Sequence, residues 1–100
     1  MFIGTGWDIH KHSNSEPLTL GGVVFDEDGF EAHSDGDILL HALIDAILGA
    51  TSNNDIGHYF PSNEKTPLNI ASTEMLKSIL EEINFSIFKI NNIDMTLISQ

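Results

Sequence analysis

A nearly unbroken apolar segment over residues 38–48 constrains the fold of this chain more than any other part of its sequence. The segment contains only two polar residues, His41 and Asp45, and together with Asp37 they recur at intervals of four. Residues four apart lie on one face of an α-helix. The pattern therefore predicts a helix over 34–49 that is buried on most sides and carries one polar stripe.

The two ends of this helix carry local signals. Ser34 is a residue type favoured at the N-cap, and Asp35 and Asp37 would lie near the positive end of the helix dipole. Gly49 is typical of a helix C-terminus. Free backbone N–H groups around residues 32–37 would offer a phosphate site at that N-terminus. An ordinary capping segment is the alternative interpretation.

The polar stripe needs compensation, because burying carboxylate and imidazole groups is costly unless they pair with each other or bind a metal. On the helix alone, a structural Asp–His–Asp network and a metal site are both open. The D-I-H motif near the N-terminus favours a metal, since Asp8 and His10 would point to one face of an extended strand. With His41 they form an Asp-His-His set that suits zinc and leaves a fourth position open. Asp37 and Asp45 would support the set by hydrogen bonding, Asp45 by orienting the imidazole of His41.

Local patterns predict four further elements: a strand over 2–10, a hairpin with strands 18–20 and 23–25, a helix over 72–84 and a strand over 93–99. Gly21-Gly22 supplies the positive φ angles that a two-residue hairpin loop requires. Residues 26–29 are expected to form an acidic turn, and 51–67 a long polar loop. The second helix has an apolar face made of Met75, Leu76, Ile79, Leu80 and Ile83.

Composition limits the class of protein. One hundred residues make a single domain, and the absence of cysteine excludes disulfides, thiolate zinc sites and cysteine nucleophiles. Four lysines and no arginine stand against fifteen acidic residues, which gives a net charge of −11. This charge excludes a general nucleic-acid or anionic-membrane binder, because both need a basic surface. With no targeting segment and no apolar run long enough to span a bilayer, a cytoplasmic protein of bacterial type is expected.

Six segments carry a resemblance to a known family: G-T-G-W-D-I-H at 4–10, L-G-G-V at 20–23, A-H-S-D-G-D at 32–37, L-H-A-L-I-D-A-I-L-G-A at 40–50, D-I-G at 55–57 and F-P at 60–61. In order and spacing they resemble the 2-C-methyl-D-erythritol 2,4-cyclodiphosphate synthases of the non-mevalonate isoprenoid pathway. The resemblance implies an α+β fold, a two-layer sandwich in which a mixed β-sheet packs against helices, with the sheets facing inward in a homotrimer. It also implies active sites at the subunit interfaces and a central cavity that can hold an isoprenoid diphosphate.

The activity that the resemblance implies is a lyase reaction. It converts 4-diphosphocytidyl-2-C-methyl-D-erythritol 2-phosphate to 2-C-methyl-D-erythritol 2,4-cyclodiphosphate and releases CMP, by metal-assisted intramolecular phosphoryl transfer. The family's metal-binding positions fall on Asp8, His10 and His41, where a divalent metal, usually zinc, is bound and the substrate is contacted. A second metal, magnesium or manganese, is held with the substrate diphosphate.

Further site residues follow from the same motifs. The family's histidine–serine pair that contacts the 2-phosphate of the substrate falls on His33 and Ser34, and His33 has the catalytic role of stabilising the transition state. The methylerythritol pocket falls on Asp55, Ile56, Gly57, Phe60, Pro61, Ser62, Asn63 and Glu64. At 62–64 the family often has Asp-Thr-Asp, so this chain departs from the pattern at the contacts to the diol.

The resemblance covers the whole chain but only about the first three-fifths of the family's domain. We therefore expect a single domain over 1–100 that lacks its C-terminal part, which in the family carries the cytidine-binding segment and a threonine and a glutamate at the diphosphate. The alternative function is a non-catalytic truncated paralogue that binds zinc or senses isoprenoid diphosphates. Two further interpretations are a structural domain with a buried Asp–His–Asp network and a metal-dependent hydrolase that releases phosphate instead of CMP.

Overall fold

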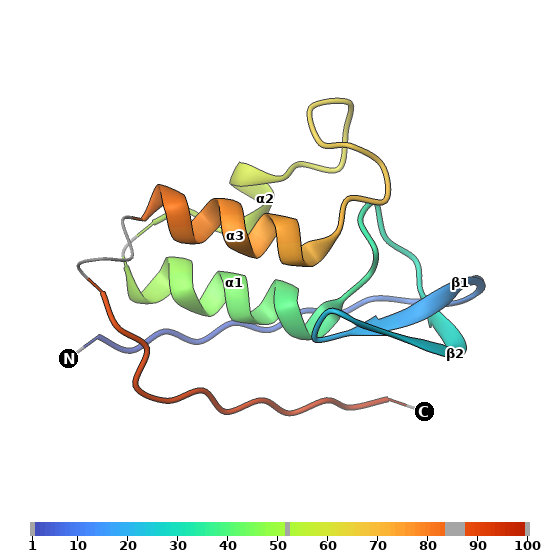
Figure 1. Ribbon diagram of the computed structural model, residues 1–100, viewed down its shortest axis with the longest axis horizontal. Helices are drawn as coiled ribbons and strands as arrows, with labels where there is room; N and C mark the ends of the chain where they lie inside the picture. Colours follow the sequence, from blue (N-terminus) through green and yellow to red (C-terminus); the bar gives the residue numbers. More distant parts are fainter. Residues whose placement is uncertain (1, 52, 84–87, 100) are drawn as a thin grey trace.

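The computed structural model describes residues 2–51, 53–83 and 88–99. In chain order the elements are β1 (His12–Leu20), β2 (Val23–Phe30), α1 (Ile38–Ala50), α2 (Ile56–Tyr59) and α3 (Ser72–Glu82). Helices α1 and α3 lie side by side, and both begin at the end of the molecule that carries the β1–β2 hairpin (Figure 1). The described residues therefore form an α+β fold, with an antiparallel sheet at one end of a helical layer.

The β1–β2 hairpin confirms the turn predicted from the glycine pair. Leu20 pairs with Val23, so only Gly21 and Gly22 join the two strands. Both glycines have positive φ angles, 60° and 83°, which is the region that two-residue hairpin loops require. The local chemistry of the turn thus fixes the register of residues 18–20 against residues 23–25.

The acidic turn predicted at 26–29 is wrong, because these residues continue strand β2. Ser13 pairs with Gly29 and Pro17 with Asp28, with a register shift between the two pairs. A Cβ on Gly29 would overlap the carbonyl oxygen of Pro17, so this irregular pairing needs a glycine. The acidic side chains remain exposed on the hairpin, which is why a highly polar segment can be a strand here.

Helix α1 begins later than predicted. Its N-cap is Asp37 and not Ser34: the Oδ1 atom of Asp37 accepts the backbone N–H of Leu40 at 3.1 Å. Gly36 has a φ of 74°, which takes the chain out of the helical path just before the cap. The helix ends at Ala50, one residue beyond the predicted end. None of the helices in the described ranges is long and apolar enough to cross a bilayer.

The hydrophobic core lies between α1 and α3. Its buried members are Ile44, Ile47, Leu48, Met75, Ile79 and Ile83. Leu76 and Leu80 are half-buried and pack against this cluster. The apolar face predicted for the second helix is therefore confirmed, and Asn84, the last residue of the predicted helix, lies outside the described residues.

Residues 2–10 are extended, as predicted, but within the described ranges they are not paired into a sheet. The segment runs along α1, in the direction opposite to that of the helix (Figure 1). Its side chains alternate like those of a strand: Trp7 and Ile9 are 76% and 78% exposed, whereas Asp8 and His10 are half-buried. Residues 7–10 thus alternate between exposed and half-buried as in a strand, although no neighbouring strand among the described residues is hydrogen-bonded to them.

The strand predicted at 93–99 is not formed among the described residues. Its apolar side chains, Ile93, Met95, Leu97 and Ile98, are between 41% and 90% exposed. An alternating pattern without a backbone partner makes an extended segment and no ladder. The observed sheet is thus two-stranded and antiparallel, and the mixed sheet implied by the resemblance is not built by the described residues. The polar loop predicted at 51–67 contains the short helix α2, which the sequence interpretation missed.

Candidate functional site

Two glycines bring the N-terminal segment close to α1. A Cβ on Gly4 would overlap the carbonyl oxygen of Ala46, and a Cβ on Gly6 would overlap that of Ala42. Only glycine at these positions lets the extended segment rest directly on the helix backbone. Because side chains in an extended chain alternate, Asp8 continues the face of the two glycines and points toward α1.

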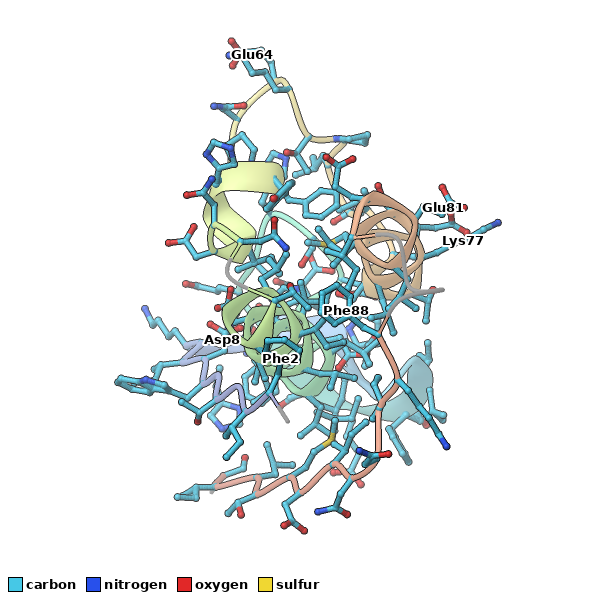
Figure 2. All side chains as sticks on the ribbon, turned by 90° about the vertical axis from the view of Figure 1, so that its left-hand side faces the viewer. Phe2, Asp8, Glu64, Lys77, Glu81 and Phe88 are labelled. Atoms are coloured by element: carbon cyan, nitrogen blue, oxygen red, sulfur yellow. The ribbon has the colours of Figure 1, made fainter. Side chains whose placement is uncertain are left out.

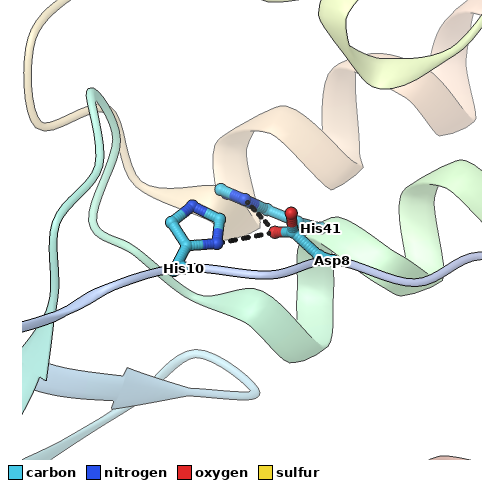
Figure 3. Close-up of side chains that lie close together, drawn as sticks. All are labelled: Asp8, His10 and His41. Carbon is cyan, nitrogen blue, oxygen red and sulfur yellow. Dashed lines mark hydrogen bonds and ion pairs between the residues drawn. The ribbon is translucent and has the colours of Figure 1, made fainter.

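Asp8, His10 and His41 converge between this segment and α1 (Figure 3). The Oδ2 atom of Asp8 lies 3.0 Å from Nδ1 of His10 and 3.2 Å from Nδ1 of His41. One possible ligand atom from each residue lies within 4.8 Å of the others. The side chain of His41 is buried, and those of Asp8 and His10 are half-buried, so the cluster is partly closed to water.

The cluster has the features of a divalent-metal site. Nδ1 of His10 is buried and has no hydrogen bond of acceptable geometry within the described part of the chain, although Asp8 lies close to it. A buried imidazole nitrogen without a hydrogen bond is costly, and coordination to a cation would satisfy it. One carboxylate oxygen and two imidazole nitrogens are donors that suit zinc. The residues present therefore fit the metal that the D-I-H motif predicts.

The electrostatics of Asp8 agree with this role. Burial by itself raises the pKa of the Asp8 carboxyl, but the attraction of the nearby His10 and His41 side chains outweighs burial. The pKa of Asp8 consequently falls well below its ordinary value. Asp8 therefore presents an ionised carboxylate, the form that binds metals.

His41 is oriented by groups other than those predicted. Its Nε2 atom lies 2.9 Å from Oγ of Ser72 and 3.1 Å from Oγ of Ser34, while Nδ1 faces Asp8. Asp45, which was expected to orient the imidazole, accepts the backbone N–H of Ile56 at 2.7 Å and so holds the start of α2. The partners of His41 are thus a carboxylate on one side and two hydroxyls on the other.

Asp45 lies in an unfavourable environment for a charge. Burial raises the pKa of its carboxyl, and the negative charges of Asp55 and Asp8 raise it further. The hydrogen bond from Ile56 and the charge of His41 act in the opposite direction but do not compensate. Asp37, the other residue predicted to support the cluster, is fully buried and binds the hairpin backbone through Gly21 and Gly22.

Ser34 lies next to the cluster, and His33 precedes Ser34 in the chain. Ser34 Oγ accepts the backbone N–H of Gly36 at 3.2 Å and also contacts His41. Nε2 of His33 donates to the carbonyl oxygen of Thr66 at 2.6 Å, so the loop after α2 holds this ring. The N–H groups of Gly36 and Asp37 bind the side chains of Ser34 and Asp35. At these two amides the structure corresponds to the ordinary capping interpretation.

The residues predicted to line the methylerythritol pocket lie on α2, at its two ends and in the loop that follows it. Asp55 caps α2 by accepting the N–H of His58 at 3.0 Å, and Ile56 and Phe60 pack against the core. Pro61 is half-buried, whereas Gly57 and the stretch 62–64 are exposed. Glu64 lies at the tip of a loop on the far side of α2 from Asp8 (Figure 2).

Sequence reasoning missed Ser72 and Asp35 as members of this site. Ser72 is fully buried, and its hydroxyl donates to Oδ1 of Asp35 while it contacts His41. Ser72 stands at the start of a predicted helix, where serine is common for local reasons. Its partners lie 37 and 31 residues away, so no local signal in the sequence points to them.

Comparisons with known proteins agree on one family. A family model described as the YgbB family matches residues 1–100. The 2-C-methyl-D-erythritol 2,4-cyclodiphosphate synthase of Buchnera aphidicola subsp. Schizaphis graminum is 48% identical over 101 residues, which cover 100% of this chain and 60% of that protein. The chain thus spans about three-fifths of the length of this curated relative.

Solved structures show the same likeness. The bifunctional IspDF from Campylobacter jejuni matches with a TM-score of 0.76 and 42% identity, over 83% of this chain and 23% of that protein. A 2C-methyl-D-erythritol-2,4-cyclodiphosphate synthase in a form bound to CDP matches with a TM-score of 0.72 and 35% identity, over 84% of this chain and 57% of that one.

Proposed function

The chain belongs to the YgbB family, and on that premise we propose that it acts in the synthesis of 2-C-methyl-D-erythritol 2,4-cyclodiphosphate. The proposed substrate is 4-diphosphocytidyl-2-C-methyl-D-erythritol 2-phosphate, and CMP is the leaving group. The observation that carries the proposal is the convergence of Asp8, His10 and His41 directly beside Ser34. This convergence supports a cation site next to a hydroxyl suited to a phosphate, in a protein of net charge −11.

In the proposed reaction an oxygen of the 2-phosphate attacks the β-phosphorus of the diphosphate. The bond between the β-phosphorus and the oxygen of the CMP phosphate breaks, and CMP leaves with that electron pair. Phosphoryl transfer of this kind asks the protein mainly to position the phosphates and to neutralise charge. With only four lysines and no arginine, the chain has few basic side chains for this task.

Asp8, His10 and His41 would hold a divalent metal, which we propose to be zinc because of the one-oxygen, two-nitrogen donor set. When bound, such an ion neutralises phosphate charge and polarises phosphoryl oxygens. The substrate diphosphate would take a second metal, magnesium or manganese, which prefer oxygen ligands. Asp8 contributes an ionised carboxylate, since its lowered pKa keeps it deprotonated in neutral solution.

Ser34 and His33 are proposed to receive the 2-phosphate. Ser34 Oγ already accepts from Gly36 and contacts Nε2 of His41, so its hydroxyl hydrogen is available to a phosphate oxygen. His33 donates its Nε2–H to Thr66, and a second proton on the ring would give an Nδ1–H donor for the charge that develops in the transition state. His33 is therefore the proposed catalytic residue.

The pocket residues support an assembly with shared sites. Because Glu64 lies far from Asp8 within one chain (Figure 2), we propose that the segment 55–64 meets substrate at a subunit interface in a homotrimer. Asp55, Ile56, Gly57, Phe60, Pro61, Ser62, Asn63 and Glu64 would then face the diol or the nucleotide. The same assembly would enclose a central cavity for an isoprenoid diphosphate, and the reaction is proposed to take place in the cytoplasm.

Native mass spectrometry and a CMP-release assay test this function together. We expect three subunits with one zinc each, and CMP formation from the cytidine diphosphate substrate. The variant His41→Ala should lose both zinc and CMP formation, by at least about a hundredfold for the latter. His12→Ala removes an exposed histidine from β1 and is the matched control.

Three results would contradict the proposal in different ways. Undiminished turnover by His41→Ala in metal-free buffer would remove the metal from the mechanism. Zinc binding without CMP formation would favour the truncated, non-catalytic paralogue. Release of inorganic phosphate in place of CMP would favour a hydrolase.

A further inference from the structure

A continuous chain of hydrogen bonds runs from Asp35 through Ser72 to His41. The hydroxyl of Ser72 donates to Oδ1 of Asp35 and lies 2.9 Å from Nε2 of His41. Both Ser72 and His41 are buried, so these contacts are shielded from water. The Nδ1 atom on the other side of the same ring faces Asp8.

The direction of each hydrogen bond in this chain is determined by the groups present. A carboxylate only accepts, and a serine hydroxyl has a single hydrogen, which Ser72 donates to Asp35. Ser72 Oγ can therefore only accept from His41, so Nε2 of His41 carries a hydrogen. In a neutral imidazole, Nδ1 then has a lone pair, and it points at the site shared with Asp8 and His10.

From this geometry we propose that Ser72 and Asp35 are positioning residues that hold His41 as the Nε2–H tautomer and so prepare Nδ1 to bind the metal. The inference rests on the proposed function, because it assumes that the cluster takes a cation. Nδ1 of His41 and Oδ2 of Asp8 are 3.2 Å apart, so in this tautomer a lone pair of the ring and an oxygen of the carboxylate face one another, as two ligands of one cation would. The hydrogen bonds from Asp35 through Ser72 thus turn the lone pair of Nδ1 toward the position that a cation would occupy.

Ser72 does not cap α3, which is the commonest role of a serine at the start of a helix. Ser72 is the first residue of α3, but the N-cap is Ala71, whose side chain makes no capping hydrogen bond. The hydroxyl of Ser72 instead contacts Asp35 and His41. Asp35 in turn accepts the backbone N–H groups of Ser72 at 3.0 Å and of Asp37 at 3.1 Å, so its carboxylate is fixed between the starts of α3 and α1.

Ser34 shares the Nε2–H of His41 at 3.1 Å, but its place in the proposed mechanism is different. Ser34 is half-buried, next to the site expected for a phosphate, and it would turn toward substrate. Ser72 is fully buried and bound to Asp35, so it keeps its contact with His41 whether or not substrate is present. Ser72 is therefore the permanent acceptor.

Two measurements on the purified protein test this assignment. Competition with a chromophoric chelator gives the zinc Kd, and ¹⁵N NMR of the histidines in metal-free, alkaline buffer shows which nitrogen of His41 carries hydrogen. Ser72→Ala should weaken zinc binding about 10–100-fold, as expected for the loss of an outer hydrogen-bond partner, and should populate the Nδ1–H tautomer. Ser72→Thr keeps the hydroxyl and should restore the Kd to within about threefold of the unaltered protein. Ser78→Ala, an exposed position on the same helix, should leave both readouts unchanged.

The possible results distinguish a failure of the positioning role of Ser72 from a failure of the proposed function. A zinc Kd within about twofold of the original in folded Ser72→Ala, or an Nδ1–H tautomer in the unaltered protein, would overturn the positioning role. If Ser72→Ala does not fold, the spectrum of the unaltered protein and the Kd of Ser72→Thr decide the question. An unaltered protein that holds the Nε2–H tautomer but binds no zinc would refute the proposed function and leave the hydrogen-bond relay intact.

Discussion

The carboxylate of Asp37, at the start of α1, accepts the backbone N–H of Gly22 at 2.7 Å, across fifteen residues of sequence. The same carboxylate accepts N–H groups from Gly21 at 3.0 Å and from Leu40 at 3.1 Å. A carboxylate that is fully buried would be strongly destabilising alone, and three N–H donors offset that cost. Asp37 therefore caps its helix and fastens the hairpin turn to it.

The first prediction concerns this double role. Asp37→Ala should lower the free energy of unfolding by about 2–4 kcal/mol, because it removes an N-cap and leaves backbone donors of Gly21 and Gly22 without their acceptor. Urea denaturation followed by circular dichroism measures this loss. Asp26→Ala, at an exposed position on β2, is the control and should change stability by less than about 0.5 kcal/mol. Equal stability of Asp37→Ala and the unaltered protein would show that the hairpin does not depend on this carboxylate.

The second prediction compares two glycines. Gly6→Ala should destabilise the protein by about 1–3 kcal/mol and weaken zinc binding at least tenfold, because the added Cβ overlaps the carbonyl of Ala42 and lifts Asp8 from the helix. Gly49→Ala should instead stabilise by about 0.5–1 kcal/mol, since its Cβ meets nothing closer than 4.0 Å and alanine favours a helix. Thermal melts and zinc titrations of both variants give the comparison. A Gly6→Ala protein with normal zinc affinity would mean that the segment is not seated on α1 as described.

The third prediction concerns pH and Asp45. The pKa of Asp45 is raised in the folded protein. Between the ordinary pKa and the raised one, Asp45 is protonated in the folded state but ionised in the unfolded state. The contribution of Asp45 to stability therefore falls as pH rises from the ordinary carboxyl value through the raised one. Asp45→Asn keeps an oxygen for the N–H of Ile56 but carries no charge. In the metal-free protein this variant should be the more stable one at neutral pH, and its advantage should shrink toward acid.

Urea titrations at several pH values check this dependence. Asp26→Asn, an exposed substitution, is the control and should show no pH-dependent gain. If Asp45→Asn is less stable than the unaltered protein at neutral pH, the carboxylate charge itself must be needed to hold Ile56.

The fourth prediction concerns metal removal. Zinc at about 100 times its Kd should add about 2.7 kcal/mol to the free energy of unfolding, because it binds the folded cluster. Chelation should reverse the gain, and His10→Ala should abolish it by removing one of the three donors. A stability that does not respond to zinc or chelator would favour the purely structural interpretation of the cluster.

Features determined by neighbouring residues could be predicted from the sequence. The Gly21-Gly22 turn depends on the φ angles that glycine permits, and the apolar face of α3 depends on helical spacing. The meeting of Asp8 with His41 was also predictable, because alternation on one segment and the four-residue stripe on the helix each turn their polar groups inward.

Features determined by distant residues could not be predicted. The start of α1 depends on a carboxylate that reaches back to the hairpin, and a capping serine at position 34 is equally plausible locally. The segments 2–10 and 93–99 have the pattern of strands, but pairing needs a neighbour that the pattern does not specify. The polar stripe predicted on α1 is present, but Asp45 accepts the backbone N–H of Ile56. The imidazole of His41 contacts the hydroxyl of Ser72 instead of Asp45.

The number of residues between Gly6 and Asp8 determines whether Asp8 and His10 can reach His41. Each residue of an extended segment advances about 3.3 Å and reverses the side-chain direction. One residue inserted after Trp7 would turn both Asp8 and His10 away from α1. Two inserted residues would restore the direction but shift the pair by about 6.6 Å, more than a full turn of helix, past His41. Insertions and deletions at this point should therefore be as damaging as loss of the donors themselves.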